Sequence, residues 1–321
     1  MPYATFQQLT EQLMQHFQNQ RYAEALELIM AHGDTFPESR MWADYWKMVS
    51  AARLEKRQLV YDVARKSLED GLWYGEVLWR QSPSYAPLQG DPEFEQIVAD
   101  SRRAHLRDMP STEPIVITKL PSDHSAQSPL LIALHGNQST AERTLPFWDP
   151  AVLDGWVTVI PQSDQVMFKN AFAWDDIERS CAYVKSQYEA LDVSFDSKRV
   201  VIAGHSMGGL IAIRMALEGL MPVCGFVVNG PATPYLDDPK QLDKLLVPAR
   251  DRGLRAYFIL GEEDQAINAI EVKNLAEKLN AAGISCGVEM VANSTHDYNP
   301  AYEPALHRGL AFILEKTGSK G

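Results

Sequence analysis

The spacing of apolar residues divides the chain into two parts. From Thr5 to about Arg107, apolar residues recur every three or four positions, as they do along helices that bury one face. One such row consists of Phe6, Leu9, Leu13 and Phe17. No strand pattern interrupts this segment, so we predict a smaller all-α domain over residues 1–108.

Part of the helical segment resembles a tetratricopeptide repeat. The stretch RYAEALELIMAHGDTFPE, which ends near Pro37, is similar to the second half of one repeat, and LQGDPEFEQIVADSRR is similar to the end of a degenerate array. The resemblance implies self-association or protein contact through this domain. An ordinary bundle of helical hairpins that packs on its neighbour remains the alternative.

After Met109 the pattern changes to short apolar runs that alternate with amphipathic stretches, and Pro/Ser-bearing segments mark the boundary. Alternating strands and helices of this kind predict a parallel sheet covered on both faces. We therefore expect an α/β domain over residues 109–321, with a doubly wound, mostly parallel sheet. The expected strands are 131–136, 156–161, 199–204, 223–230, 255–261 and 286–291, and the expected helices lie near 176–191, after Ser206, and near 239–250, 267–281 and 303–316.

Charge and cysteine content narrow the class of protein. Lys and Arg number 30 against 42 Asp and Glu, which gives a formal net charge of -12 at pH 7. Such a chain repels phosphate groups, so neither nucleic acid nor a membrane is expected as a partner. The 3 cysteines form no C-x-x-C pair, and the N-terminus lacks the pattern of a signal peptide. We expect a cytoplasmic protein without disulfides or membrane spans.

The strongest chemical signal is Gly204-His205-Ser206-Met207-Gly208, which follows a predicted strand and precedes a predicted helix. In this context G-x-S-x-G forms a sharp turn that exposes a nucleophilic serine, with small residues where side chains would collide. The start of the next helix directs its N–H groups at charge that develops nearby. Ser206 is therefore the predicted nucleophile.

A serine nucleophile needs a base and a carboxylate that orients the base. Asp264 and His296 each follow a predicted strand, in the chain order Ser, Asp, His that this kind of fold uses. Glu262 and Glu263 are the alternatives to Asp264. His205 fits less well because it adjoins the nucleophile. Five further histidines lie in the helical domain, before the core strands, or in the last predicted helix (His16, His32, His105, His124 and His307).

Acyl transfer also needs N–H donors for the oxyanion. We expect the backbone N–H of Met207 and that of Asn137, with Gly136 as the second choice in the same loop. Phe172 and Trp174 are candidates to line a substrate pocket, or else the edge of the core.

The motifs LHGN, GHSMGG, GEED and STHD together resemble the α/β-hydrolase superfamily, in particular its compact phospholipase/carboxylesterase and dienelactone-hydrolase branch, close to feruloyl esterases. The resemblance spans residues 129–316 and implies a serine esterase that works through an acyl-enzyme on a small-molecule ester. No metal or nucleotide motif is present, so we expect no cofactor. Asp175 and Asp176 could form a carboxylate pair, but Asp175 with Glu178 fits a capping box.

Two alternatives stay open at this point. A serine peptidase or thioesterase uses the same three residues, because pocket shape selects the leaving group. The chain could instead be a catalytically inert interaction protein. Only about 25 residues separate the strands near Asn229 and Arg255, too few for a cap domain. We hypothesise that the helical domain covers the site and selects substrates.

Overall fold

The computed structural model describes residues 3–108, 115–233, 239–296 and 298–315, and the chain divides into two compact units. One unit consists of Met1–Thr112 with Val166–Lys169, and the other consists of Glu113–Gln165 with Asn170–Gly321. The predicted boundary at residue 109 lies outside the described residues. The sequence pattern did not indicate that Val166–Lys169 joins the helical unit.

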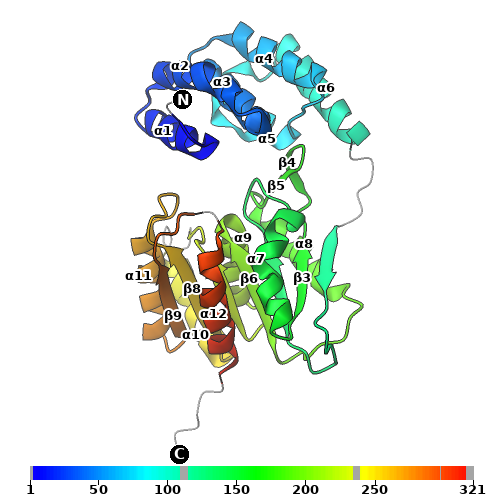
Figure 1. The fold of residues 1–321 in the computed structure, drawn as a ribbon, viewed down its shortest axis with the longest axis vertical. Helices are drawn as coiled ribbons and strands as arrows, with labels where there is room; N and C mark the ends of the chain where they lie inside the picture. Colours follow the sequence, from blue (N-terminus) through cyan, green and yellow to red (C-terminus); the bar gives the residue numbers. More distant parts are fainter. Residues whose placement is uncertain (1–2, 109–114, 234–238, 297, 316–321) are drawn as a thin grey trace, which may run out of the picture. The chain divides into compact units, whose positions relative to one another are not determined.

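The first unit is helical, as predicted (Figure 1). Its apolar rows meet in a core that includes Leu9, Leu13 and Ile29, each with no exposed surface. Thr5 caps the first helix, since its side chain accepts a hydrogen bond from the Gln8 N–H. The helices are α1 (Phe6–Gln18), α2 (Tyr22–His32), α3 (Arg40–Arg53), α4 (Arg57–Glu69), α5 (Glu76–Gln81) and α6 (Pro92–Asp108).

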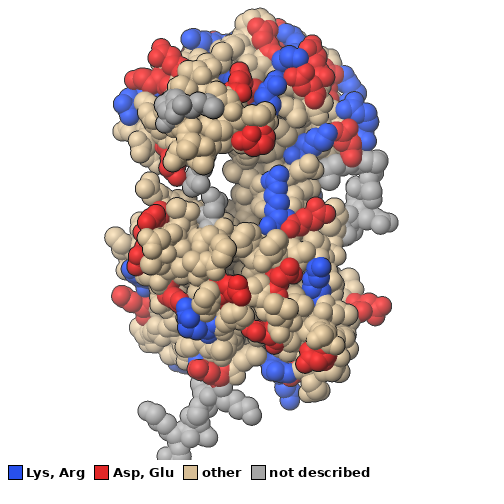
Figure 2. All heavy atoms as spheres, in the orientation of Figure 1, with Lys and Arg blue, Asp and Glu red and all other residues tan. Residues whose placement is uncertain are grey.

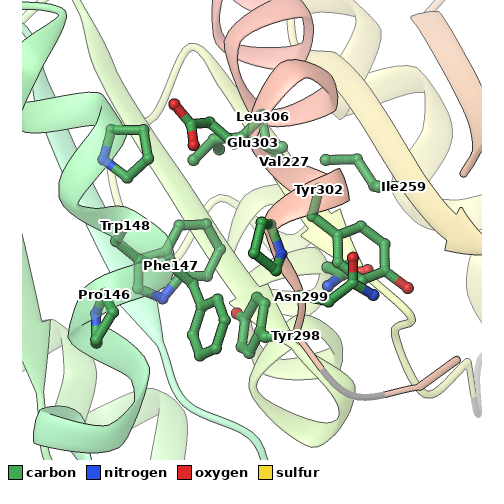
Figure 3. Close-up of a pocket in the computed structure, with 13 residues that line it drawn as sticks. Pro146, Phe147, Trp148, Val227, Ile259, Tyr298, Asn299, Tyr302, Glu303 and Leu306 are labelled. Carbon is green, nitrogen blue, oxygen red and sulfur yellow. The ribbon is translucent and has the colours of Figure 1, made fainter. Parts of the chain in front are cut away.

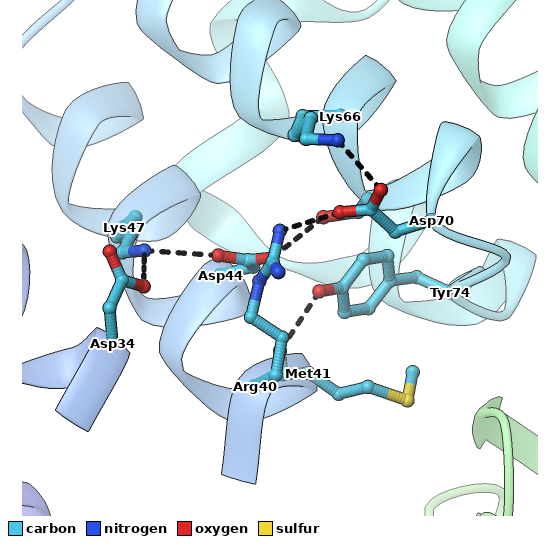
Figure 4. A network of polar contacts seen from close by, with 9 residues as sticks. Asp34, Arg40, Met41, Asp44, Lys47, Lys66, Asp70 and Tyr74 are labelled. Atoms are coloured by element: carbon cyan, nitrogen blue, oxygen red, sulfur yellow. Dashed lines mark hydrogen bonds and ion pairs between the residues drawn. The ribbon is translucent and has the colours of Figure 1, made fainter. Parts of the chain in front are cut away.

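A network of charged side chains with a buried centre joins α3 to its neighbours (Figure 4). Asp44 and Lys47 are only 2% and 6% exposed. The Asp44 carboxylate accepts hydrogen bonds from Arg40, from Lys47 and from the Ser67 hydroxyl, over 2.6, 3.1 and 3.0 Å. Lys47 also pairs with Asp34. Each charge of this cluster has a partner of opposite sign, which offsets the cost of burial.

The segment Val166–Lys169 packs within the helical unit through its backbone and one aromatic ring. The Gly75 N–H donates to the Met167 carbonyl, and Phe168 forms an antiparallel bridge with Tyr74. The Phe168 ring lies edge-on to Trp42, with 4.5 Å between ring centroids. These contacts explain why four residues from the middle of the chain belong to the N-terminal unit.

The second unit contains a seven-stranded sheet in the order β1-β3-β2-β6-β7-β8-β9. β1 runs antiparallel to β3, and the other neighbours are parallel, which confirms the predicted mostly parallel sheet. The strands are β1 (Val116–Lys119), β2 (Leu130–Leu134), β3 (Val157–Pro161), β6 (Val200–His205), β7 (Gly225–Asn229), β8 (Arg255–Gly261) and β9 (Ser285–Val291). β1 was not among the expected strands, and neither were the two short strands of a separate sheet, β4 (Gln165–Phe168) and β5 (Ala171–Ala173).

Helices cover both faces of the sheet (Figure 1). One face carries α8 (Ile177–Glu189), α9 (Ser206–Glu218), α10 (Pro239–Asp251) and α11 (Ala269–Ala281). The other face carries α7 (Ala141–Leu153) and α12 (Glu303–Leu314). Among the described residues, no helix combines the length and apolarity required to cross a bilayer.

Candidate active site

Ser206 lies at the sharp junction between β6 and α9, with a φ of 53° that side chains rarely adopt. A Cβ on Gly204 would lie 2.4 Å from the Gly208 carbonyl carbon, and a Cβ on Gly208 would lie 2.3 Å from the His135 carbonyl oxygen. Both glycines are therefore required for the backbone to turn. Strained backbone of this kind is typical of functional positions.

His296 and Asp264 lie in the loops after β9 and β8, and they are hydrogen bonded, with 2.8 Å between Nδ1 and Oδ2. The Asp264 side chain is 4% exposed. Burial raises the pKa of Asp264, but the hydrogen bond and charge of His296 and the N–H groups of Ala266 and Ile267 bring it below its ordinary value. Asp264 is therefore ionised at neutral pH and faces Nδ1 of His296 as a hydrogen-bond acceptor.

The other candidates for acid and base lie elsewhere. The side chains of Glu262 and Glu263 are exposed, and His307 on α12 pairs with Asp154. His124 contacts the Ser194 carbonyl through Nε2.

His205 is a packed histidine, and it also holds the backbone of His296. Its Nε2 lies 2.7 Å from the His296 carbonyl oxygen, so this nitrogen donates. Its ring contacts those of His296 and Tyr298, with centroid distances of 4.6 and 4.5 Å. Burial lowers the pKa of His205 to about 3, so the ring is neutral at physiological pH.

The loop after β7 passes beside these groups, a contribution that sequence reasoning missed. Gly230 has a φ of 48°, and a Cβ there would lie 3.0 Å from Asp264 Oδ2 and 3.1 Å from His296 Nδ1. Two residues later, the Ala232 N–H donates to the Ser206 carbonyl over 3.2 Å. One loop therefore contacts all three predicted catalytic residues. The signal in the sequence was a glycine directly after a strand, V-V-N-G.

The loop after β2 lies beside Ser206. A Cβ on Gly136 would lie 3.4 Å from Ser206 Cβ and 2.7 Å from His205 Nδ1. The Gln138 N–H donates to the Phe172 carbonyl over 2.7 Å. Among the residues that the structure describes, none accepts a hydrogen bond from the N–H of Asn137 or of Met207.

The Asn137 side chain ties this loop to the start of α8. Its Oδ1 accepts from the Trp174 N–H over 2.8 Å, and its Nδ2 donates to Asp175 over 2.7 Å. The predicted capping box is wrong by one residue, because Asp176 caps α8 by accepting from the Arg179 N–H over 3.1 Å. Asp175 instead accepts the hydrogen bond from Asn137 Nδ2.

His135, the first residue after β2, is buried at the start of the same loop. It has no exposed surface, its Nε2 accepts from the Ser163 N–H over 3.1 Å, and burial lowers its pKa to about 4. The indole N–H of Trp174 donates to the His135 carbonyl over 2.7 Å. Trp174 has no exposed surface and Phe172 is 6% exposed, so the core interpretation fits Trp174.

Comparison with known proteins shows which family and which solved structures the chain resembles. Residues 161–308 match the model of the Dienelactone hydrolase family. A search of curated proteins finds no match. A solved structure of an uncharacterised Bacillus cereus ATCC 10987 protein is similar over 97% of this chain and 99% of its own, with 24% identity and a TM-score of 0.54. Esterase PE8 is similar over 63% of this chain and 98% of its own, with 16% identity and a TM-score of 0.50.

These similarities to solved structures establish the fold, and the family match indicates an enzyme of the hydrolase type. The chain thus has an α/β-hydrolase fold preceded by a helical region, and its residues 161–308 are similar to the Dienelactone hydrolase family.

Proposed function

We propose that this protein is a serine esterase that hydrolyses small carboxylic esters through an acyl-enzyme. The observation that carries the proposal is the convergence of Ser206 and the Asp264–His296 pair on the loop after β7. A strained serine, a histidine base and an ionised carboxylate are the groups that acyl transfer requires.

In the first step Ser206 Oγ attacks the ester carbonyl carbon while His296 Nε2 accepts the hydroxyl proton. Asp264 holds the imidazole by its Nδ1 hydrogen bond of 2.8 Å and stabilises the imidazolium that forms. The N–H groups of Met207 and Asn137 stabilise the oxyanion. The C–O bond to the alcohol then breaks, and His296 returns the proton to the departing oxygen.

In the second step water attacks the acyl-enzyme and His296 accepts its proton. The tetrahedral intermediate uses the same two N–H groups, and its collapse releases the carboxylic acid and restores Ser206. The proposal needs no cofactor for either step, because each proton is accepted and returned by His296.

The test is hydrolysis of p-nitrophenyl esters from acetate to dodecanoate by the protein and by its Ser206→Ala variant. We expect the protein to hydrolyse esters of this series. The kcat should fall by about 10⁶-fold in Ser206→Ala, because members of such a triad act as a unit. Equal activity of the two proteins would contradict the proposal. Inactivity on every ester, with Ser206 reactive, would instead favour a peptidase or thioesterase.

A further inference from the structure

Tyr302 lies directly before α12, at the end of the short 3₁₀ helix η5 (Pro300–Tyr302), and is 5% exposed. Its ring belongs to the apolar cluster on the face of the sheet that α7 and α12 cover. In Figure 3 the ring lies on one wall of a cavity, and its hydroxyl points away from Phe147 and Trp148 in that view. The packed ring therefore directs its hydroxyl toward the loops beyond the sheet.

The Tyr302 hydroxyl holds the peptide group that precedes His296. It donates to the Thr295 carbonyl oxygen over 2.6 Å. On the other side of His296, Nε2 of His205 lies 2.7 Å from the His296 carbonyl oxygen. Because peptide groups are planar, fixing the two groups that flank a residue leaves its Cα little freedom. These two hydrogen bonds therefore fix the point from which the His296 imidazole projects.

The same hydroxyl lies against the end of β8, the strand that leads to Asp264. A Cβ on Gly261, the last residue of β8, would lie 2.7 Å from the Tyr302 hydroxyl oxygen and 2.7 Å from the Thr295 carbonyl oxygen. Only a residue without a side chain permits so close an approach. The Tyr302 hydroxyl is therefore located where the loop of Asp264 and the loop of His296 meet.

We propose that Tyr302 is a positioning residue for His296. Its hydroxyl holds the Thr295–His296 peptide so that the imidazole faces Asp264, with the observed 2.8 Å between Nδ1 and Oδ2. Tyr302 acts through His296 and takes no part in proton transfer. The inference rests on the esterase function proposed above, because it concerns the base of that same reaction.

Tyr298 provides the matched control. Its hydroxyl oxygen is buried and has no hydrogen-bond partner among the described residues. Tyr298→Phe therefore removes a hydroxyl without removing a hydrogen bond, whereas Tyr302→Phe removes the donor to the Thr295 carbonyl. Both variants keep the aromatic ring, so the packing of the apolar cluster is retained.

The test compares the full-length wild type, Tyr302→Phe and Tyr298→Phe in two measurements. One is hydrolysis of the best p-nitrophenyl ester, and the other is the rate at which a fluorophosphonate forms an adduct with Ser206. We expect Tyr302→Phe to lower kcat and the rate of adduct formation by about five- to fiftyfold with KM nearly unchanged, because a misplaced base slows proton transfer. Tyr298→Phe should leave both rates nearly unchanged.

The amount of adduct at the end point gives the fraction of folded protein, so a partly unfolded variant is distinguished from a slow one. Equal kcat and equal rates of adduct formation for the wild type and Tyr302→Phe would overturn the proposal. A change in KM alone would also overturn it, because Tyr302 would then affect substrate binding and not the base.

The same measurements separate this proposal from the esterase function. If the wild type hydrolysed no ester but Ser206 reacted with the fluorophosphonate, the esterase proposal alone would fail, and the rates of adduct formation would still test Tyr302. If Ser206 did not react, both proposals would fail.

Discussion

Three histidines near the candidate site have different surroundings. His205 and His135 are buried, with pKa values lowered to about 3 and about 4, and each donates or accepts fixed hydrogen bonds as a neutral ring. His296 instead faces the ionised Asp264. The sequence distinguished His296 by its place after a strand, but it did not show that His205 holds the His296 backbone, since the two lie 91 positions apart.

His205→Leu removes the donor to the His296 carbonyl and should lower kcat by about ten- to a hundredfold with little change in KM, because small misplacements of a catalytic base are costly. His205→Gln retains an N–H donor and should recover part of the rate. The measurement is steady-state hydrolysis of the best ester. Equal kcat for the wild type and His205→Leu would show that the contact does not position His296.

Stability should fall as the pH drops below about 6.5, the ordinary pKa of histidine. The folded protein keeps His205 neutral down to a pH of about 3, so between these values the unfolded chain binds more protons. The free energy of unfolding then decreases as pH falls, by up to about 1.4 kcal/mol per pH unit for one histidine. Urea denaturation at pH 4 to 7 should show a shallower dependence for His205→Gln. An unchanged slope would mean that His205 is not buried as a neutral ring.

At the scale of elements, some predictions failed where local signals compete. The helix α7 was not predicted because Pro146 and Pro150 lie inside it, and proline ordinarily ends a helix. By contrast, α9 was predicted because a strand, a glycine-flanked serine and an unbroken apolar run follow in order. Strands β4 and β5 have only 4 and 3 residues, too few for a periodic pattern to show.

At the start of α8, the neighbouring carboxylates of Asp175 and Asp176 make different contacts. Asp176→Ala removes the N-cap and should destabilise the protein by about 1 kcal/mol with kcat nearly unchanged. Asp175→Ala releases the Asn137 side chain, so it should lower kcat and leave stability nearly unchanged. Thermal denaturation and ester hydrolysis of the two variants provide the comparison. If Asp175→Ala lost stability and Asp176→Ala lost kcat instead, Asp175 would be the N-cap of α8.

At the scale of the whole molecule, the sequence predicted a helical region and an α/β unit but not that residues 166–169 pack with the helices. Apolar periodicity reports which face of an element is buried, not which partner buries it. Phe168 and Trp42 are 126 positions apart, and nothing local to either indicates that their rings meet.

The charged network of α3 should contribute strongly to the stability of the helical unit. Asp44→Ala leaves Lys47 buried beside one partner instead of two, and loss of one member of a buried ion pair typically costs about 3–5 kcal/mol. Asp62→Ala, whose side chain is 59% exposed, is the matched control and should have little effect. Hydrogen exchange resolved by segment should show faster exchange of α3 and α4 in Asp44→Ala alone. Similar exchange in both variants would mean that the network is not required.

The central claim is that Ser206 is a nucleophile activated by His296, and intact-mass analysis after treatment with a fluorophosphonate tests it most directly. We predict one adduct per chain, mapped by peptide sequencing to Ser206, absent from Ser206→Ala and formed far more slowly in His296→Ala. No adduct on the folded protein, or an adduct on a different residue, would contradict the account.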